Sequence, residues 1–291
     1  MEEAWKRRAL FGVVLSIFLA AIESTVVATA MPTIVASLGG IEVYSWVFSG
    51  FLLTATVTMP LWGRLSDLFG RRRTFLAGLT IFLAGSALSG VAQDIIQLIV
   101  FRMLQGLGAG SLMTIGMTIV GDLFGLERRA KMQGYLSGVY GVASLLGPLA
   151  GGFLADHVSW RWVFYLNLPI GALAMALIAS ALRDEAPARR RPVIDYAGLT
   201  LFAAGVTALL VALMALGRAA AWTRTDVVVP LVVAALALGG FVPVERRARE
   251  PIVPLRLFRE RVVLAAAVTG FLTGMAMFGA ISFVPLFMQD V

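Results

Sequence analysis

The sequence has no cysteine and only one histidine, His157, among its 291 residues. The lack of cysteine excludes disulfide bonds, thiolate zinc sites and iron–sulfur clusters. Charged residues make up 14% of the chain and hydrophobic residues 59%, whereas a soluble domain has about 25% charged and about 45–50% apolar residues. With a mean hydropathy of +0.88, the composition excludes a water-soluble globule, a coiled coil and a disordered chain.

Sequence motifs of catalysis are missing as well. The chain has no HExxH helix, no nucleophile elbow and no Walker loop, so neither a hydrolase site nor an ATP-driven pump is expected. We predict a protein that is not an enzyme and that holds no metal and no cofactor.

Nine apolar stretches are long enough, at about 20 residues, to cross the roughly 30 Å hydrocarbon core of a bilayer as helices. They occupy residues 10–34, 44–63, 74–93, 96–121, 132–155, 162–182, 194–217, 226–243 and 262–288. The first stretch follows basic residues, as a signal peptide does, but it exceeds the about 7–15 apolar residues of such a signal. We predict an all-α, multi-pass membrane protein whose first span is not cleaved.

Basic residues separate the two sides of the membrane. Twenty of the 24 lysines and arginines lie in the N-terminal segment and in alternate loops: Lys6, Arg7, Arg8, Arg64, Arg71, Arg72, Arg73, Arg128, Arg129, Lys131, Arg183, Arg189, Arg190, Arg191, Arg246, Arg247, Arg249, Arg256, Arg259 and Arg261. Because short loops rich in Lys and Arg stay in the cytoplasm, we predict a cytoplasmic N-terminus, a plasma-membrane location and an external residue 291. The net charge of +7 is then a signal of topology and not of nucleic-acid binding.

Two charged residues fall inside predicted spans. Glu23 lies in the middle of the first span, and Arg102 lies about two turns into the fourth. A charge at mid-bilayer costs roughly 2.5–3.5 kcal/mol on insertion scales, so each residue needs a partner or a polar cavity. One interpretation is that they pair with each other, or with backbone carbonyls, to hold helices together. The other is that both face a water-filled cavity, where a carboxylate can bind a proton and a cation in turn.

Glycine is concentrated in the fifth span, where small residues let helix backbones approach closely. The span contains Gly134, Gly138, Gly141, Gly147, Pro148, Gly151 and Gly152. Static close packing explains part of this set. The Gly-Pro step followed by Gly-Gly favours a bent, pliable helix at a moving interface, since proline removes a backbone donor.

The loop GRLSDLFGRRRTF, residues 63–75, joins two spans through very few residues. It therefore predicts a tight antiparallel hairpin in which Gly63 and Gly70 permit close approach. The positive-inside rule accounts for its arginines without any function. It does not account for Asp67, which lies one turn from Arg71 and Arg72.

These segments resemble the major facilitator superfamily of secondary transporters over essentially the whole chain. The loop resembles the family signature G-x-L-x-D-x-x-G-R-R, and the fourth span is similar to L-x-x-x-R-x-x-Q-G-x-G-A from Leu98 to Ala109, Gln105 included. The fifth span resembles the antiporter signature G-x8-G-x3-G-P-x2-G-G, with Ala143 in place of its middle glycine.

Two further stretches resemble the fourteen-helix drug:proton antiporter branch of that family. IESTVVATAMPTI, residues 22–34, is similar to the first-helix signature, in which Glu23 takes the place of the usual aspartate. SWRWVFYLNLPIG, residues 159–171, resembles the start of the sixth helix of the same branch. The resemblance implies a multidrug efflux permease driven by the proton gradient.

The resemblance also implies roles for parts of the chain. Residues 1–183 would form a six-helix bundle, 184–243 two additional helices, and 244–291 a cytoplasmic loop and the first helix of a second bundle. Access to a midplane site would alternate by rocking of the bundles. Glu23 and Arg102 would couple protons to substrate, and Gly63, Asp67, Gly70, Arg71 and Arg72 would form a cytoplasmic gate. Trp46, Gln105, Tyr140, Phe164 and Tyr165 are candidates to line the cavity, although core or interfacial packing is the alternative for each aromatic ring.

The length departs from that branch, because five helices of its second bundle are missing after the ninth predicted span. We expect a fragment of a longer protein that inserts but does not transport alone; a native truncation is the alternative. Export of small lipophilic or cationic molecules is the leading functional hypothesis. The alternatives are transport of one specific metabolite, in or out, and a non-transporting half-transporter or sensor; an accessory protein stays open.

Overall fold

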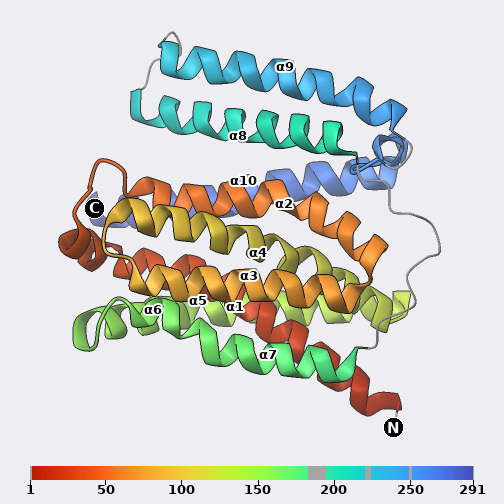
Figure 1. Cartoon of the computed structure of the whole chain (residues 1–291), viewed down its shortest axis with the longest axis horizontal. Helices are drawn as coiled ribbons and strands as arrows, with labels where there is room; N and C mark the ends of the chain where they lie inside the picture. The colour runs from red at the N-terminus through yellow and green to blue at the C-terminus, as the bar shows by residue number, and fades with distance from the viewer. Residues whose placement is uncertain (1, 183–194, 220–223, 249–250, 291) are drawn as a thin grey trace.

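The computed structural model describes residues 2–182, 195–219, 224–248 and 251–290, and the regular structure in these ranges is entirely helical (Figure 1). The elements are α1 Glu2–Leu38, α2 Ser45–Phe69, α3 Arg71–Val91, α4 Ile95–Leu123, α5 Leu126–His157, α6 Trp162–Tyr165, α7 Asn167–Ala181, α8 Tyr196–Ala219, α9 Thr225–Arg247, the 3-10 helix η1 Leu255–Arg259 and α10 Arg261–Asp290. The predicted all-α, multi-pass class is confirmed.

Eight helical segments of the described residues are long and apolar enough to cross a membrane. They match the first eight predicted spans, although α1 begins earlier, at Glu2, because a helix continues beyond the hydrocarbon core. The ninth span, 262–288, falls in α10, where the described apolar stretch is Arg261–Ala276. The loop arginines 183 and 189–191, Arg249, the start of the seventh span at 194 and the domain boundary at 183/184 lie outside the described residues.

The sixth span was predicted as one helix over 162–182 and is divided at Leu166 into α6 and α7. Pro169 lies four residues after Tyr165 and has no backbone N–H to donate to the Tyr165 carbonyl. The helical hydrogen-bond ladder is therefore interrupted between the two segments. This interruption places Asn167 at the first position of α7.

Helices α1 and α4 form the centre of the bundle built by α1 to α7. Helices α2 and α3 pack on α4, α5 and α7 pack on α1, and α1 also contacts α4. Glycines allow the closest of these contacts: a Cβ atom on Gly85 of α3 would lie 2.5 Å from the backbone nitrogen of Gln105 in α4. The α3–α4 pair is thus held at a separation that only a glycine permits at this point.

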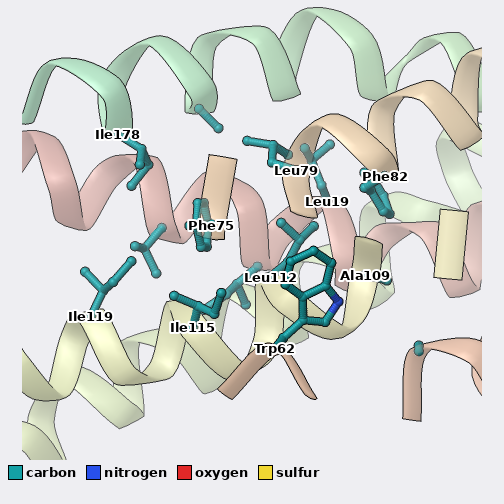
Figure 2. Close-up of a cluster of buried hydrophobic side chains, with 14 of the residues drawn as sticks. Leu19, Trp62, Phe75, Leu79, Phe82, Ala109, Leu112, Ile115, Ile119 and Ile178 are labelled. Atoms are coloured by element: carbon teal, nitrogen blue, oxygen red, sulfur yellow. The ribbon is translucent and has the colours of Figure 1, made fainter. Parts of the chain in front are cut away.

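Two apolar clusters fill the bundle. The first cluster packs Trp62, Phe75, Phe82 and Leu112 with residues of α1, α4 and α7 (Figure 2). The second cluster gathers residues from α1, α2, α4, α5 and the α6 region, including Ile22, Leu98 and Phe164. Along α1 the first cluster reaches Leu19 and the second begins at Ala21. The two clusters therefore follow each other along the same helices.

Helices α8 and α9 form an antiparallel hairpin that contacts the bundle through α8 and α2 (Figure 1). At one end of the hairpin, buried Glu245 accepts the Val253 N–H through Oε1 at 2.5 Å. Its Oε2 and Asp195 Oδ2 are both buried without a hydrogen-bond partner in the described part of the chain, and both oxygens lie around Gly198. Glu245 thus connects Val253, in the segment before η1, to helix α9 of the hairpin. Its side chain also faces the carboxyl group of Asp195.

We expect Glu245→Gln to strengthen this tie. The glutamine carbonyl keeps the bond from Val253, and its new NH₂ group donates to Asp195 Oδ2, which removes one of two facing carboxylates. A net hydrogen bond contributes about 0.5–1.5 kcal/mol, so hydrogen exchange of the Val253 amide should slow by up to about tenfold. Glu260→Gln, at an exposed acid nearby, is the matched control and should leave that exchange rate unchanged; faster exchange in Glu245→Gln would contradict the described geometry.

Candidate functional site: a buried polar layer

Five buried polar side chains lie where the two apolar clusters meet: Glu23, Ser86, Arg102, Gln105 and Asn167. They come from α1, α3, α4 and α7, and each is at most 1% exposed. Along α4, Ile99 belongs to the second cluster and Ala109 to the first, so Arg102 and Gln105 fall between them. We call these five residues the polar layer. Apolar side chains separate it from both ends of the bundle.

The two charges of the polar layer contact each other directly. Arg102 Nη1 donates to Glu23 Oε1 and also to Gln105 Oε1, the latter at 2.8 Å. Both side chains of the ion pair are completely buried. The structure thus brings the predicted pair together, and Gln105, predicted to line the cavity, is buried beside the guanidinium. Whether the pair couples protons to substrate stays a prediction.

Arg102 has further partners that fix its guanidinium in place. Its Nε donates to the Val47 carbonyl at 3.4 Å, and its Cζ atom lies 4.1 Å from the centroid of the Phe51 ring. The ring of Phe164 is also close, at 6.0 Å. Aromatic faces attract a guanidinium when water is excluded. The charge is therefore balanced by one carboxylate, two carbonyl-type oxygens and an aromatic face.

Asn167 and Ser86 complete the polar layer and were not singled out from the sequence. Asn167 Nδ2 donates to Glu23 Oε2 and, at 2.9 Å, to Ser86 Oγ. Ser86 in turn donates to the Phe164 carbonyl at 2.8 Å. Uncharged polar residues are common in membrane helices, so composition gives little signal for them. The proline two residues after Asn167, which interrupts the sixth span, is the signal that could have indicated it.

A second polar cluster lies where α2 meets α3, at the predicted gate. Gly70 joins the helices with a φ of +91°, a conformation that suits glycine. Arg71 forms an ion pair with Asp67, donates to Ser66 Oγ at 2.6 Å and donates to Asp122 Oδ2 of α4 at 3.2 Å. Asp122 was not predicted; an aspartate at the end of an apolar span was its only signal.

The remaining predicted gate residues lie around this cluster. The Gly63 carbonyl accepts the Ser66 hydroxyl at 2.7 Å, and Arg72 is half-buried next to Arg71. Exposed ion pairs contribute little to stability, with a median of about 0–1 kcal/mol. The bonds of Arg71 therefore link α2 to α4 at this end of the bundle and add little to the stability of the fold.

The small residues of α5 divide into two groups. Gly147 and Gly151 face α1: a Cβ on Gly151 would lie 2.5 Å from the Val26 carbonyl oxygen, and one on Gly147 would overlap Thr25. Ala143, the departure from the antiporter signature, is fully buried on the same stripe. By contrast, a Cβ on each of four other glycines meets no described atom within 4 Å: Gly134, Gly138, Gly141 and Gly152. Helix α5 continues through Pro148.

The aromatic candidates for the cavity lie in different surroundings. Phe164 is fully buried in the second cluster, and Trp46 is half-buried against it. Tyr165 packs on Gly90 of α3, and Tyr140, 38% exposed, donates to Met113 Sδ at 3.0 Å. Of the four, Tyr140 is the most exposed. Contact of any of them with substrate stays a prediction.

Apolar helices of membrane-spanning length around a buried ion pair are features of a multi-pass membrane protein of the transporter class. The chain belongs to the Major Facilitator Superfamily, whose family model matches residues 13–291. The expectation drawn from the sequence motifs is thereby confirmed, and with it a transporter family rather than an enzyme family.

Similar proteins support this assignment. The chain is 42% identical over 281 residues to the multidrug transporter protein MdtP of Bacillus subtilis (strain 168), covering 96% of this chain and 52% of that protein. It is 39% identical over 290 residues to multidrug resistance protein 3 of the same organism, covering 100% and 56%. The crystal structure of the human organic anion transporter MFSD10 (TETRAN) shares the fold, with a TM-score of 0.54, 20% identity and coverage of 70% and 55%. The chain spans about half the length of the curated relatives it matches.

Proposed function

We propose that this chain forms the proton-binding bundle of a plasma-membrane exporter, which exchanges protons for small lipophilic or cationic molecules by alternating access. The observation that carries the proposal is the completely buried Glu23–Arg102 pair between two apolar clusters. An ionisable pair at such a place is costly in a membrane helix, and a functional site is the usual reason for it. The names of two relatives, a multidrug transporter and a multidrug resistance protein, support the substrate class.

The chemistry follows from the charge of Glu23. While Glu23 is ionised, Arg102 and Asn167 neutralise and hydrogen-bond its carboxylate. A proton on Glu23 removes that charge and leaves the Arg102 guanidinium without its counter-ion, which changes the balance of forces between α1 and α4. Proton binding therefore biases the relative position of two central helices. The proton gradient is the energy source, and no bound cofactor is required.

The tie between α2 and α4 at Arg71 would act as the cytoplasmic gate of this cycle. Its bonds to Asp67 and Asp122 are exposed and weak enough to open and close. The role requires that the N-terminus and the α2–α3 connection lie in the cytoplasm, which is the orientation that the distribution of basic residues predicts.

Dye efflux tests the proposal. Residues 1–291 are joined to the part of MdtP beyond its matched segment and expressed in cells that lack their own drug exporters. We expect the fusion to lower the accumulation of a lipophilic cationic dye, and a protonophore to abolish this effect. Glu23→Gln should abolish it as well, because the glutamine cannot release a proton.

Glu42→Gln is the matched control: it makes the same chemical change at an exposed acid between α1 and α2. It should export dye like the parent. Export that survives the protonophore, or that persists in Glu23→Gln at an equal protein level, would contradict proton coupling through Glu23.

A further inference from the structure

Asn167 is held in one orientation by two helices besides its own. Its side chain is 1% exposed, and its Nδ2 group uses both hydrogens, one for Glu23 Oε2 of α1 and one for Ser86 Oγ of α3. Ser86 is itself fixed by its bond to the Phe164 carbonyl, one turn before Asn167. The amide is therefore oriented for a glutamate that only accepts hydrogen bonds, which is the ionised form.

The other end of the same amide has no partner. Asn167 Oδ1 is buried and accepts no hydrogen bond from the described residues. A buried acceptor without a partner is unusual and needs an explanation. Unlike an arginine, which only donates, an asparagine carries a donor and an acceptor at nearly equivalent positions, so a half-turn of the amide exchanges them.

Protonation of Glu23 supplies the missing donor. When Oε2 gains a proton it becomes an O–H group, and the Nδ2 group then faces a donor instead of an acceptor. A half-turn of the Asn167 amide brings Oδ1 to this position, where it accepts the Glu23 O–H. The Ser86 hydroxyl, which lies next to the same position, can donate to Oδ1 or keep its bond to Phe164. Each protonation state of Glu23 then has a matched partner.

We propose that Asn167 is a positioning residue that turns its side-chain amide as Glu23 gains and loses its proton, and so stabilises both forms. The inference rests on the proposed function in one respect, that Glu23 exchanges a proton. Arg102 cannot hydrogen-bond to Glu23 in both protonation states in this manner, because a guanidinium has donors only and cannot accept the Glu23 O–H. Gln105 is engaged through its carbonyl oxygen with Arg102.

Two spectroscopic measurements on the whole chain in lipid bilayers test the inference without any need for transport. In a pH titration followed by infrared difference spectroscopy, Glu23 is identified by the carboxylic acid C=O band that is lost in Glu23→Gln. We expect Asn167→Leu, which keeps the shape and removes both polar atoms, to move this band to higher wavenumber. Ser89→Ala is the matched control, because Ser89 is a buried serine one turn from Ser86 whose hydroxyl donates to the Gly85 carbonyl within α3. It should leave the band in place.

The second measurement needs no change at Asn167. The side-chain ¹⁵N signal of Asn167 is followed by solid-state NMR through the same titration in the parent chain and in Glu23→Gln. We expect it to shift with the infrared band of Glu23 in the parent and to stay constant in Glu23→Gln. A Glu23 band that titrates while the Asn167 signal does not move overturns the inference and leaves the proposed function standing. A Glu23 that gives no titrating band overturns both.

Discussion

Arg102→Leu is expected to destabilise the chain more than the double change Glu23→Met with Arg102→Leu. Both members of the pair are completely buried. Removal of one partner leaves an uncompensated charge in the interior, which costs about 3–5 kcal/mol, whereas replacement of both by apolar residues of similar volume is often neutral or stabilising. Leucine also loses the contacts of Arg102 with the Phe51 ring and the Val47 carbonyl, and the double variant shares that loss.

The two single changes should differ in their response to pH. In Arg102→Leu the remaining charge is a carboxylate, and a proton can neutralise it, so the destabilisation should shrink in acid. In Glu23→Gln the remaining charge is a guanidinium, which does not deprotonate in proteins. There the glutamine oxygen can still accept from Arg102, so the loss is smaller, and the stability of this variant does not depend on a proton at residue 23.

Thermal unfolding in detergent, followed through the fluorescence of the six tryptophans, measures these differences. The unfolding midpoint should be lowest in Arg102→Leu, higher in Glu23→Gln, and highest of the three in the double variant. Equal losses in Arg102→Leu and in the double variant would mean that the pair carries no buried, mutually compensated charge. That result would also remove the main support for a proton site at Glu23.

Much of this site is predictable from the sequence because the hydrocarbon core of a bilayer tolerates few charged side chains. An acid and an arginine inside apolar spans need a partner or water, and Glu23 and Arg102 are the two residues that break the apolar pattern of their spans. The same argument predicts all eight described spans, since about 20 apolar residues are needed to cross. Charge and length are therefore strong signals in this class of protein.

Uncharged polar residues, and a charge at the end of a span, carry a weaker signal. Asn167, Ser86 and Asp122 are recognised as parts of the polar clusters only once the helices are assembled, because the rotation of each helix about its axis decides which side chains face inward. Rotation is set by packing between helices, and a nearly uniform apolar sequence does not encode it in its periodicity. The placement of Tyr165 on Gly90, next to a Phe164 that faces Arg102, shows the same limit.

The glycines of α5 illustrate how rotation divides a motif. Gly147 and Gly151, together with Ala143, repeat every four residues and so lie on one face of the helix, which packs on α1. Gly134, Gly138 and Gly141 lie elsewhere and contact no described neighbour at their missing Cβ. Gly134 and Gly138 are also four residues apart, so the spacing alone does not reveal which small residues pack on a neighbouring helix.

Gly151→Ala and Gly141→Ala are accordingly expected to have opposite effects, although both add one methyl group to the same helix. At Gly151 the new Cβ would lie 2.5 Å from the Val26 carbonyl oxygen. This atom belongs to the α1 backbone and cannot turn away, so α1 and α5 must separate. Overpacking of this kind costs about 1–3 kcal/mol. At Gly141 no described atom lies within 4 Å, and alanine gains up to about 1 kcal/mol over glycine in a helix.

The unfolding midpoint should therefore fall in Gly151→Ala and rise slightly in Gly141→Ala. Efflux by the fusion with MdtP separates packing from movement. If α5 must slide on α1 through the Gly151 contact, Gly151→Ala should reduce efflux even at a temperature where the protein is fully folded. A fall in stability without a loss of efflux would make the contact purely structural. A shift of both midpoints in the same direction would contradict the described α1–α5 interface, because only that interface distinguishes the two glycines.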